Sequence, residues 1–366
     1  MADTKDTAAP TGGSSGAAQH PKTMRAWTYS AASPSLESCL HLSADAPHPK
    51  PQGIPAGSKK DEVLVRVTAA TINPIDYKLP EGLGGLGTRA MFGHPAIPGL
   101  DYAGVVVASS ASNSTGGLAE GTRVFGRLEP CRFGTLGEFV IATRAGCAAL
   151  PANVDPVDAA CVGTAGLTAY QSLAPYVVPG DSVFINGGSG GTGTWGIQMA
   201  KALGCKQVVV SCSAGNAELC RSLGADEVID YATQNVTEVL KAKGPVFKVV
   251  VDNVGSSPAD LYKAAGTFLV PGGQFVQVGA SASLGAAKTL VERMLLPGFL
   301  GGGKSKFSLM MAKNDHDALA QIGTWMQEGK VKAVVDEVFS YEDAPKAFQR
   351  LKTGRSKGKV VIKHTS

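Results

Sequence analysis

The sequence has 366 residues, of which 44% are hydrophobic and 17% charged, and its formal net charge is +4. This length exceeds what one ordinary hydrophobic core needs, so two domains are expected. The small, scattered positive charge argues against nucleic acid as the main partner, and no apolar run reaches the 18 residues of a membrane span.

The seven cysteines are odd in number and form no C-x-x-C pair, which favours free thiols in a reducing compartment. The N-terminus has no apolar core of a secretory signal and no arginine before Arg25, which is poor material for a transit peptide. We therefore expect a cytoplasmic protein; import into an organelle is left open but is not signalled. Residues 1–22 are rich in Ala, Gly, Ser, Thr and Pro, and are predicted to be a disordered tail.

The first half of the chain is typical of a compact β-rich domain, in which short strands are bounded by glycine and proline. Residues 45–60 contain four prolines and read as a surface loop, and residues 81–93 as a glycine-rich, mobile loop. An Asn-Pro turn at residues 69–80 opens a short helix, with Asp76 as its cap. Strands are expected at residues 24–29, 61–68, 94–108, 123–125 and 136–143.

The pattern changes near residue 151 to alternating strands and helices, which predicts a parallel sheet with helices on both faces. A helix at residues 155–173 precedes the alternation. The expected strands are 183–185, 207–211, 227–229, 248–252 and 273–279, and the expected helices between them are 194–203, 216–223 and 259–268.

A glycine-rich turn lies between the strand at 183–185 and the helix at 194–203, and it fits G-x-G-x-x-G in the context that this motif requires. Glycine lets backbone N–H groups approach a pyrophosphate, which the positive end of the following helix then faces. The turn therefore predicts dinucleotide binding by Gly188, Ser189, Gly190, Gly191, Thr192 and Gly193.

Residues 281–312 are ambiguous and suggest a loop or lid. A helix at 315–329 and strands at 331–339 and 360–363 follow. Because the nucleotide fold is expected to be complete by about residue 279, this last part is predicted to rejoin the β-rich domain. The predicted domains are 23–150 with 313–366, and 151–312 for the nucleotide.

Four segments together resemble the zinc-free, quinone oxidoreductase-like branch of the medium-chain dehydrogenase/reductase superfamily. They are NPID at 73–76 followed by Lys78, PGLDYAGVV at 98–106, GTAGLTAY at 163–170 and LGADEVIDY at 223–231. The likeness is to the subgroup of plastid quinone oxidoreductase homologues and fungal trans-acting enoyl reductases. It implies a GroES-like β-rich domain plus a Rossmann doubly wound domain, with the ligand site between them. A homodimer is implied only as a habit of this family.

The sequence predicts no metal site. In zinc-dependent relatives the first ligand would lie near residues 71–73, where this chain has no cysteine, and their Gly-His-Glu motif aligns with GLD at 99–101. Tetrahedral zinc needs four converging donors, or three and a water. On this count of ligands the chain lacks a strong Lewis acid for alcohol oxidation, so alcohol dehydrogenation is disfavoured.

The cofactor is expected to be NADPH. NAD-preferring folds place a carboxylate about twenty residues past the glycines, whereas this chain has Ser-Cys-Ser at 211–213 and no acid before Glu218. Ser213 and Asn216 can bind a 2′-phosphate, and the resemblance adds Tyr231, for which a packed aromatic at a strand end is the alternative.

The resemblance also implies nicotinamide contacts from Thr164 and from the backbone at Val278 and Gly279. A further contact is expected from Gly358 and Lys359, although this basic run also reads as a solvated strand edge. Asp252 follows a strand at its carboxyl end, where it would face the cofactor and orient it.

The chemistry expected is hydride transfer from NADPH to a quinone or to the β-carbon of an enone. Lys78 is the candidate donor to the oxygen on which charge develops, with a surface lysine as the alternative. Asn73 is expected to line the site, and Tyr77 is a candidate proton donor that also reads as packing. Two other functions stay open: a trans-acting enoyl reductase of a polyketide pathway, and an NADPH-binding redox sensor or structural protein without turnover.

Overall fold

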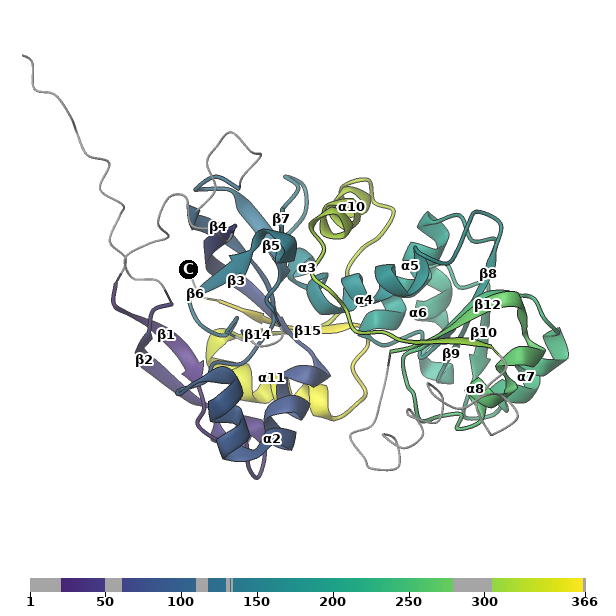
Figure 1. Ribbon diagram of the computed structural model, residues 1–366, viewed down its shortest axis with the longest axis horizontal. Coiled ribbons are helices and arrows are strands. Elements are labelled where there is room, and N and C mark those ends of the chain that lie inside the picture. The colour runs from purple at the N-terminus through teal and green to yellow at the C-terminus, as the bar shows by residue number, and fades with distance from the viewer. Residues whose placement is uncertain are drawn as a thin grey trace, which may run out of the picture.

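The computed structural model describes residues 21–49, 61–109, 118–129, 132, 134–278 and 305–364. Nearly all of the expected tail at 1–22 lies outside these residues. Figure 1 shows two lobes side by side, one built on a mostly antiparallel sheet and one on a parallel sheet. None of the described helices is both long enough and apolar enough to cross a lipid bilayer.

The nucleotide-lobe sheet has six parallel strands among the described residues. In spatial order they are β10 (Glu227–Asp230), β9 (Gln207–Cys212), β8 (Ser182–Asn186), β11 (Phe247–Asp252), β12 (Leu269–Gln277) and β13 (Lys306–Leu309). This is the doubly wound order, in which the spatial order of the strands reverses between β8 and β11. In folds of this kind, ligands bind at the carboxyl ends of the strands near that switch point. The predicted Rossmann fold is confirmed.

Helices cover both faces of this sheet, as expected. Val183 and Ile185 of β8 face one core cluster, whereas Phe184 between them faces another, because successive strand residues point to opposite faces. The helices are α4 (Gly163–Leu173), α5 (Gly191–Ala202), α6 (Ala217–Ser222), α7 (Val236–Lys243) and α8 (Leu261–Ala264).

The second lobe contains a seven-stranded sheet built from both ends of the chain. Its spatial order is β14 (Val335–Ser340), β15 (Lys359–Lys363), β3 (Glu62–Ile72), β4 (Asp101–Ser109), β5 (Arg123–Arg127) and β7 (Cys147–Ala149), with β6 (Phe139–Thr143) paired to β3. The last strand of the chain, β15, pairs antiparallel with β3, so that Val360 lies opposite Ile72. β1 (Thr23–Thr28) and β2 (His41–Pro47) form a separate antiparallel pair.

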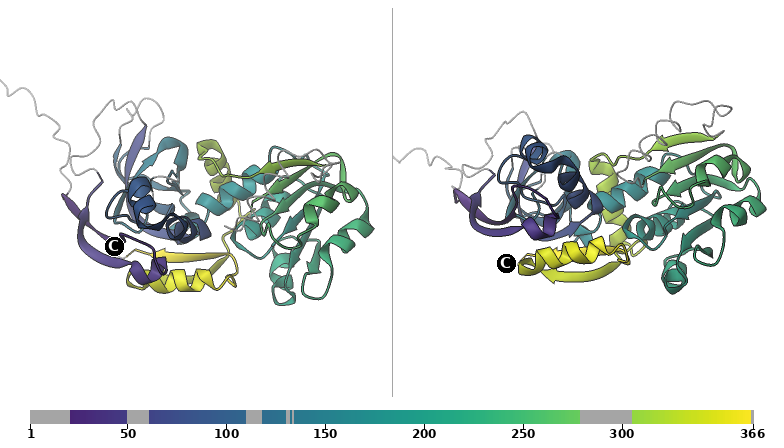
Figure 2. Two further views of the ribbon diagram at one scale, coloured as in Figure 1. Left: turned by 60° about the horizontal axis from the view of Figure 1, so that its bottom comes forward. Right: turned by 90° about the horizontal axis from the view of Figure 1, so that it is seen from below.

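Five helices complete the described part of this lobe and its border with the other. They are α1 (Leu36–Cys39), α2 (Pro74–Phe92), α3 (Pro156–Ala160), α10 (His316–Gln327) and α11 (Ala344–Lys352). Figure 2 shows α11, in yellow, lying beside the C-terminal strands, while α10 lies between the two lobes in Figure 1.

The prediction of a mobile loop at residues 81–93 is wrong, because α2 continues to Phe92. One glycine of this segment does interrupt the helix: Gly84 has φ 65° and divides α2 into two segments. Contacts outside the helix hold the first segment, where the Glu81 carboxylate accepts a hydrogen bond from Leu36 N and binds Lys352. Tertiary contacts here override a low helix propensity.

Several other predicted boundaries also differ from the structure. The expected helix at 155–173 is two helices, α3 and α4, and the helix expected at 259–268 is the four-residue α8 followed by a 3₁₀ turn. β2 covers residues 45–47 of an expected loop, and the strand expected at 331–339 begins only at Val335. β13 lies within the ambiguous 281–312 segment, so the nucleotide fold does not end near residue 279.

Candidate functional site

A row of buried polar side chains closes three neighbouring strands at the switch point. Asn186 and Asp252 are the last residues of β8 and β11, Ser211 is the last but one of β9, and the three lie in register. Ser211 Oγ donates to Asn186 Oδ1 at 2.5 Å, and Asn186 Nδ2 donates to Asp252 Oδ1 at 2.8 Å. Gly187 N and Gly188 N then donate to the Oγ and O of Ser211, at 3.1 and 2.9 Å. This row fixes the point at which the glycine-rich turn leaves the sheet.

The three motif glycines are required for different reasons. A Cβ on Gly193 would lie 2.2 Å from Gly187 O, and one on Gly188 would lie 2.8 Å from Val210 Cβ, so both allow close packing of the turn. A Cβ on Gly190 would meet nothing nearer than Gly187 O at 3.8 Å. The space beside Gly190 is therefore not taken by the protein, as expected of a turn that admits a ligand.

The amino end of α5 is suited to a phosphate anion. Gly190 is its N-cap and supplies no side-chain cap, so the N–H groups of the first turn, including those of Gly191 and Thr192, lack the usual capping partner. Because the dipole of this twelve-residue helix adds positive potential there, the turn fits the pyrophosphate of a dinucleotide.

The predicted ribose-phosphate residues lie next to this turn. Asn216 Nδ2 donates to Ser189 Oγ at 3.0 Å, which ties the segment after β9 to the glycine-rich turn. Tyr231 N donates to Cys212 O at 3.3 Å, which places Tyr231 beside Ser213. The Tyr231 side chain is not packed, since the residue is 60% exposed, and so its ring is free to contact a ligand.

Asp252 and Val278 lie on the other side of β8 from Ser211. Asp252 Oδ1 accepts from Val254 N at 3.1 Å and from Gly255 N at 2.9 Å, so this buried carboxylate shapes its own loop. Val278 N donates to Asp252 O at 2.9 Å. Gly279 lies outside the described residues.

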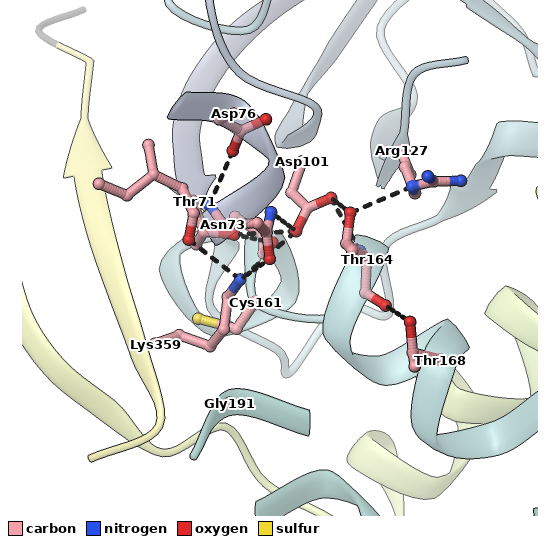
Figure 3. A network of polar contacts seen from close by, with 12 residues as sticks. Thr71, Asn73, Asp76, Asp101, Arg127, Cys161, Thr164, Thr168, Gly191 and Lys359 are labelled. Atoms are coloured by element: carbon pink, nitrogen blue, oxygen red, sulfur yellow. Dashed lines mark hydrogen bonds and ion pairs between the residues drawn. The ribbon is translucent and has the colours of Figure 1, made fainter. Parts of the chain in front are cut away.

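A second polar network lies across from the glycine-rich turn and is centred on Asp101, which is fully buried (Figure 3). Asp101 Oδ1 accepts from both the N and the Oγ1 of Thr164, each at 2.7 Å. Its other oxygen, Oδ2, accepts from Asn73 Nδ2 at 2.8 Å. The Asp101 carboxylate thus joins β4 to α4 and to the start of α2.

Lys359 enters the same network from β15. Its Nζ lies 2.5 Å from Asn73 Oδ1, 3.3 Å from Ile72 O and 3.6 Å from Asp101 Oδ2. Since the residue is only 4% exposed, the solvated strand edge considered for it is excluded.

The end of the chain also touches the glycine-rich turn. Gly358 N donates to Ser189 O at 3.1 Å, and a Cβ on Gly191 would lie 3.1 Å from Lys359 Cδ. The predicted pyrophosphate turn and the predicted nicotinamide contacts are therefore brought together by β15.

The residues of this network do not fit zinc. The segments that would hold a metal in zinc-dependent relatives do meet, through Asn73 and Asp101, but a lysine ammonium lies between them. A cationic group in hydrogen-bonding contact with these oxygens opposes a second cation and offers no lone pair to it. In the part of the chain that the structure describes, no three His, Cys, Asp or Glu side chains are grouped as metal ligands.

Two further charged groups border the network. Burial, and then the charge of Asp101, raise the pKa of Asp76 to about 7. Asp76 Oδ2 accepts from Asn73 N at 2.7 Å and completes a capping box, which confirms the predicted cap. Arg127 Nε donates to Thr164 Oγ1 at 3.1 Å, and Nη1 donates to Ala312 O and Asn314 Oδ1 at the same distance.

The structure does not join the two candidate catalytic residues of α2 to this network. Lys78 is exposed, and its side chain makes no hydrogen bond or ion pair with the residues that the structure describes. The Tyr77 ring lies 4.9 Å from the Nζ of Lys352, which also binds Glu37 and Glu81. Burial raises the pKa of Tyr77. These contacts favour packing over proton donation for Tyr77.

The sequence did not single out Asp101 or Arg127 as site residues, and of the polar row it predicted only Asp252. Asn186 is the last residue of β8 and Ser211 the last but one of β9, and polar residues after buried apolar ones could have indicated the row at the switch point. Asp101 lies within a segment that was considered only for the family resemblance and for the count of metal ligands. Arg127 carried no local signal.

Both lobes of the chain are similar to known proteins. A family model described as alcohol dehydrogenase GroES-like domain matches residues 59–154, and one described as zinc-binding dehydrogenase matches residues 223–362. The chain is 48% identical to trans-enoyl reductase pgmF of Aspergillus terreus over 94% of its own length and 97% of the relative. It is 33% identical to 2-methylene-furan-3-one reductase of Solanum lycopersicum, over 83% and 72% of the two chains.

Among solved structures, the quinone oxidoreductase of Coxiella burnetii superposes with a TM-score of 0.75 at 27% identity. The superposition covers 93% of this chain and 99% of that one. The likeness therefore extends over both lobes.

Proposed function

Since the chain belongs to the medium-chain dehydrogenase/reductase superfamily, we propose that it is an NADPH-dependent reductase of quinones or of C=C bonds conjugated to a carbonyl. One observation carries this proposal: Gly358 and Lys359, at the start of β15, connect the glycine-rich turn to the network of Asp101. A nicotinamide dinucleotide extending from the first to the second would span both lobes.

Each step is assigned to residues of this chain. The glycine-rich turn binds the pyrophosphate, and Ser213, Asn216 and Tyr231 bind the 2′-phosphate. Thr164, with the backbone at Val278, positions the nicotinamide, which supplies the hydride when the cofactor is bound. Lys78 donates a hydrogen bond to the acceptor carbonyl, on which negative charge develops during the transfer.

The identity of the acceptor is proposed from the relatives. Similarity to a trans-enoyl reductase supports an enoyl acceptor for this chain, whereas similarity to a 2-methylene-furan-3-one reductase and to a quinone oxidoreductase supports an enone or a quinone. The near-complete coverage of the trans-enoyl reductase makes a trans-acting enoyl reductase of a polyketide pathway the second candidate. All of these acceptors undergo the same hydride chemistry.

The test is NADPH oxidation by the purified protein with a panel of quinones, enones and enoyl thioesters. We expect turnover with at least one class, and the ranking of kcat/KM identifies the acceptor. Tight NADPH binding without oxidation across the panel would contradict the proposal and favour a sensor or structural role.

Lys78→Ala is expected to lower kcat by about 10- to 100-fold, because one donor to the developing oxyanion is lost. The Kd for NADPH should stay within about twofold, since the proposed contact of Lys78 is with the acceptor. Lys206→Ala, at an exposed lysine of the nucleotide lobe, is the matched control. Unchanged rate constants for Lys78→Ala would remove this residue from the mechanism.

Ser213→Asp is expected to reverse the cofactor preference. A carboxylate beside Asn216 and Tyr231 repels a 2′-phosphate but accepts hydrogen bonds from a ribose diol. We expect the KM for NADPH to rise by at least about tenfold while that for NADH stays level or falls. Steady-state kinetics with both cofactors measures this change. An equal loss with both cofactors would instead indicate general damage to the segment after β9.

A further inference from the structure

We propose that Asp101 is a positioning residue of the reductase. Its buried carboxylate accepts the hydrogen bond of the Thr164 hydroxyl, so that Thr164 can act toward the cofactor only as a hydrogen-bond acceptor. This inference rests on the proposed function, in which Thr164 contacts the nicotinamide. Beyond that contact, the inference says which partner donates the hydrogen bond, and therefore that the NH₂ group of the carboxamide faces Thr164.

The hydrogen-bond inventory of Thr164 leads to this conclusion. A hydroxyl has one proton and two lone pairs. The proton of Thr164 points to Asp101 Oδ1 at 2.7 Å, and one lone pair accepts from Arg127 Nε at 3.1 Å. One lone pair therefore remains. A nicotinamide carboxamide can satisfy it only with its NH₂ group, because its carbonyl oxygen is itself an acceptor.

The Asp101 carboxylate is held so that it cannot turn away. Oδ1 also accepts from Thr164 N at 2.7 Å, and the backbone approaches so closely that a Cβ on Gly163 would lie 2.5 Å from this oxygen. Oδ2 faces Asn73 Nδ2 and the ammonium of Lys359. The Lys359 ammonium, 3.6 Å from Oδ2, places a positive charge beside this fully buried carboxylate.

Two buried groups of this network therefore have separate roles. The Lys359 ammonium supplies the positive charge between Asn73 and Asp101. The Asp101 carboxylate, on β4, fixes the direction in which the Thr164 hydroxyl, on α4, donates its hydrogen bond (Figure 3).

The test compares the Kd of NADPH with that of its acetylpyridine analogue, in which a methyl ketone replaces the carboxamide and no N–H is offered. Wild-type protein is expected to bind NADPH roughly tenfold more tightly than the analogue, because the analogue cannot donate a hydrogen bond to the Thr164 hydroxyl. Thr164→Val should reduce this ratio to about one. Binding titrations need no turnover, so the outcome does not depend on which acceptor the enzyme reduces.

Asp101→Asn is expected to reduce the ratio as well. The Oδ2 side faces two fixed donors, Asn73 Nδ2 and the Lys359 ammonium, whereas the Oδ1 side faces one, Thr164 N, so the new amide carbonyl is expected on the Oδ2 side. The NH₂ group then faces the Thr164 hydroxyl, which accepts from it and is left to donate to the cofactor. Exchanging the two side chains, in the double variant Asn73→Asp with Asp101→Asn, puts a carboxylate beside Lys359 and returns the amide carbonyl to Thr164. The exchanged pair should therefore restore a ratio near tenfold.

Asp317→Asn, at an exposed acid in the first turn of α10, is the control and should keep the wild-type ratio. A folded Asp101→Asn variant with the full wild-type ratio would overturn the proposal. So would a folded exchanged pair that stays near one, and this second variant decides the matter if Asp101→Asn alone does not fold. Loss of turnover in wild-type protein, with the binding ratios as expected, would contradict the proposed function but not this inference.

Discussion

Replacement of Gly190 by valine is expected to abolish NADPH binding while the protein stays folded. Gly190 has φ −78° and ψ 174°, which valine adopts without strain, and no protein atom lies within 3.4 Å of a Cβ built there. The added methyl groups would stand at the amino end of α5, where the pyrophosphate is proposed to bind. We expect the Kd to rise by roughly 100-fold or more, measured by fluorescence titration.

Two further glycine variants make this result interpretable. Gly193→Val should destabilise the fold itself, because its Cβ would lie 2.2 Å from Gly187 O. Gly82→Ala, at a position with no atom within 4 Å of the new Cβ, should leave both stability and NADPH binding close to wild type. A well-folded Gly190→Val protein with unchanged NADPH affinity would refute the placement of the pyrophosphate.

Lys359→Met is expected to lower the free energy of unfolding by about 3–5 kcal/mol, the largest stability effect that we predict. Methionine keeps most of the apolar stem, one atom shorter than lysine, but leaves Asp101 as a buried carboxylate without a cation, and Asn73 Oδ1 without its donor. Removing one partner of a buried pair exposes the full desolvation cost of the other. Urea unfolding followed by far-UV circular dichroism measures the change.

A double-mutant cycle separates this effect from lost packing. Adding Asp101→Asn to Lys359→Met removes the uncompensated charge and should recover part of the loss, so the two substitutions should not be additive. Lys363→Met, at an exposed lysine of the same strand, should stay within about 0.5 kcal/mol of wild type. Strict additivity in the cycle would mean that the 3.6 Å pair contributes nothing to stability.

The alternation after residue 181 predicted the parallel sheet and its nucleotide turn well, because both depend on local patterns. The apolar run of β8, the glycines and the helix that follows are consecutive in the chain, and the structure differs mainly in starting α5 three residues earlier, at Gly191. The family resemblance was confirmed for the same reason, since its motifs are short and continuous.

Local composition failed where distant contacts compensate for it. The glycines after Pro80 predicted a loop, but Glu81 is held by Leu36 N and by Lys352, which are 45 and 271 residues away. The sixth strand of the nucleotide sheet, β13, was likewise missed, because four residues carry little periodicity and pairing with β12 stabilises them.

Local pattern alone thus established the doubly wound sheet, and it predicted a glycine-rich turn for a dinucleotide and a ribose position without an acid. The network of Asp101 became visible only in the folded chain, where Lys359 and Asn73 are 286 residues apart and Asp101 and Thr164 are 63 apart. A hydrogen bond depends on the distance between two atoms, whereas sequence periodicity reports only the spacing within one element. Buried polar groups of this kind are brought together by sheet closure, and no single stretch of the chain records which partners they will have.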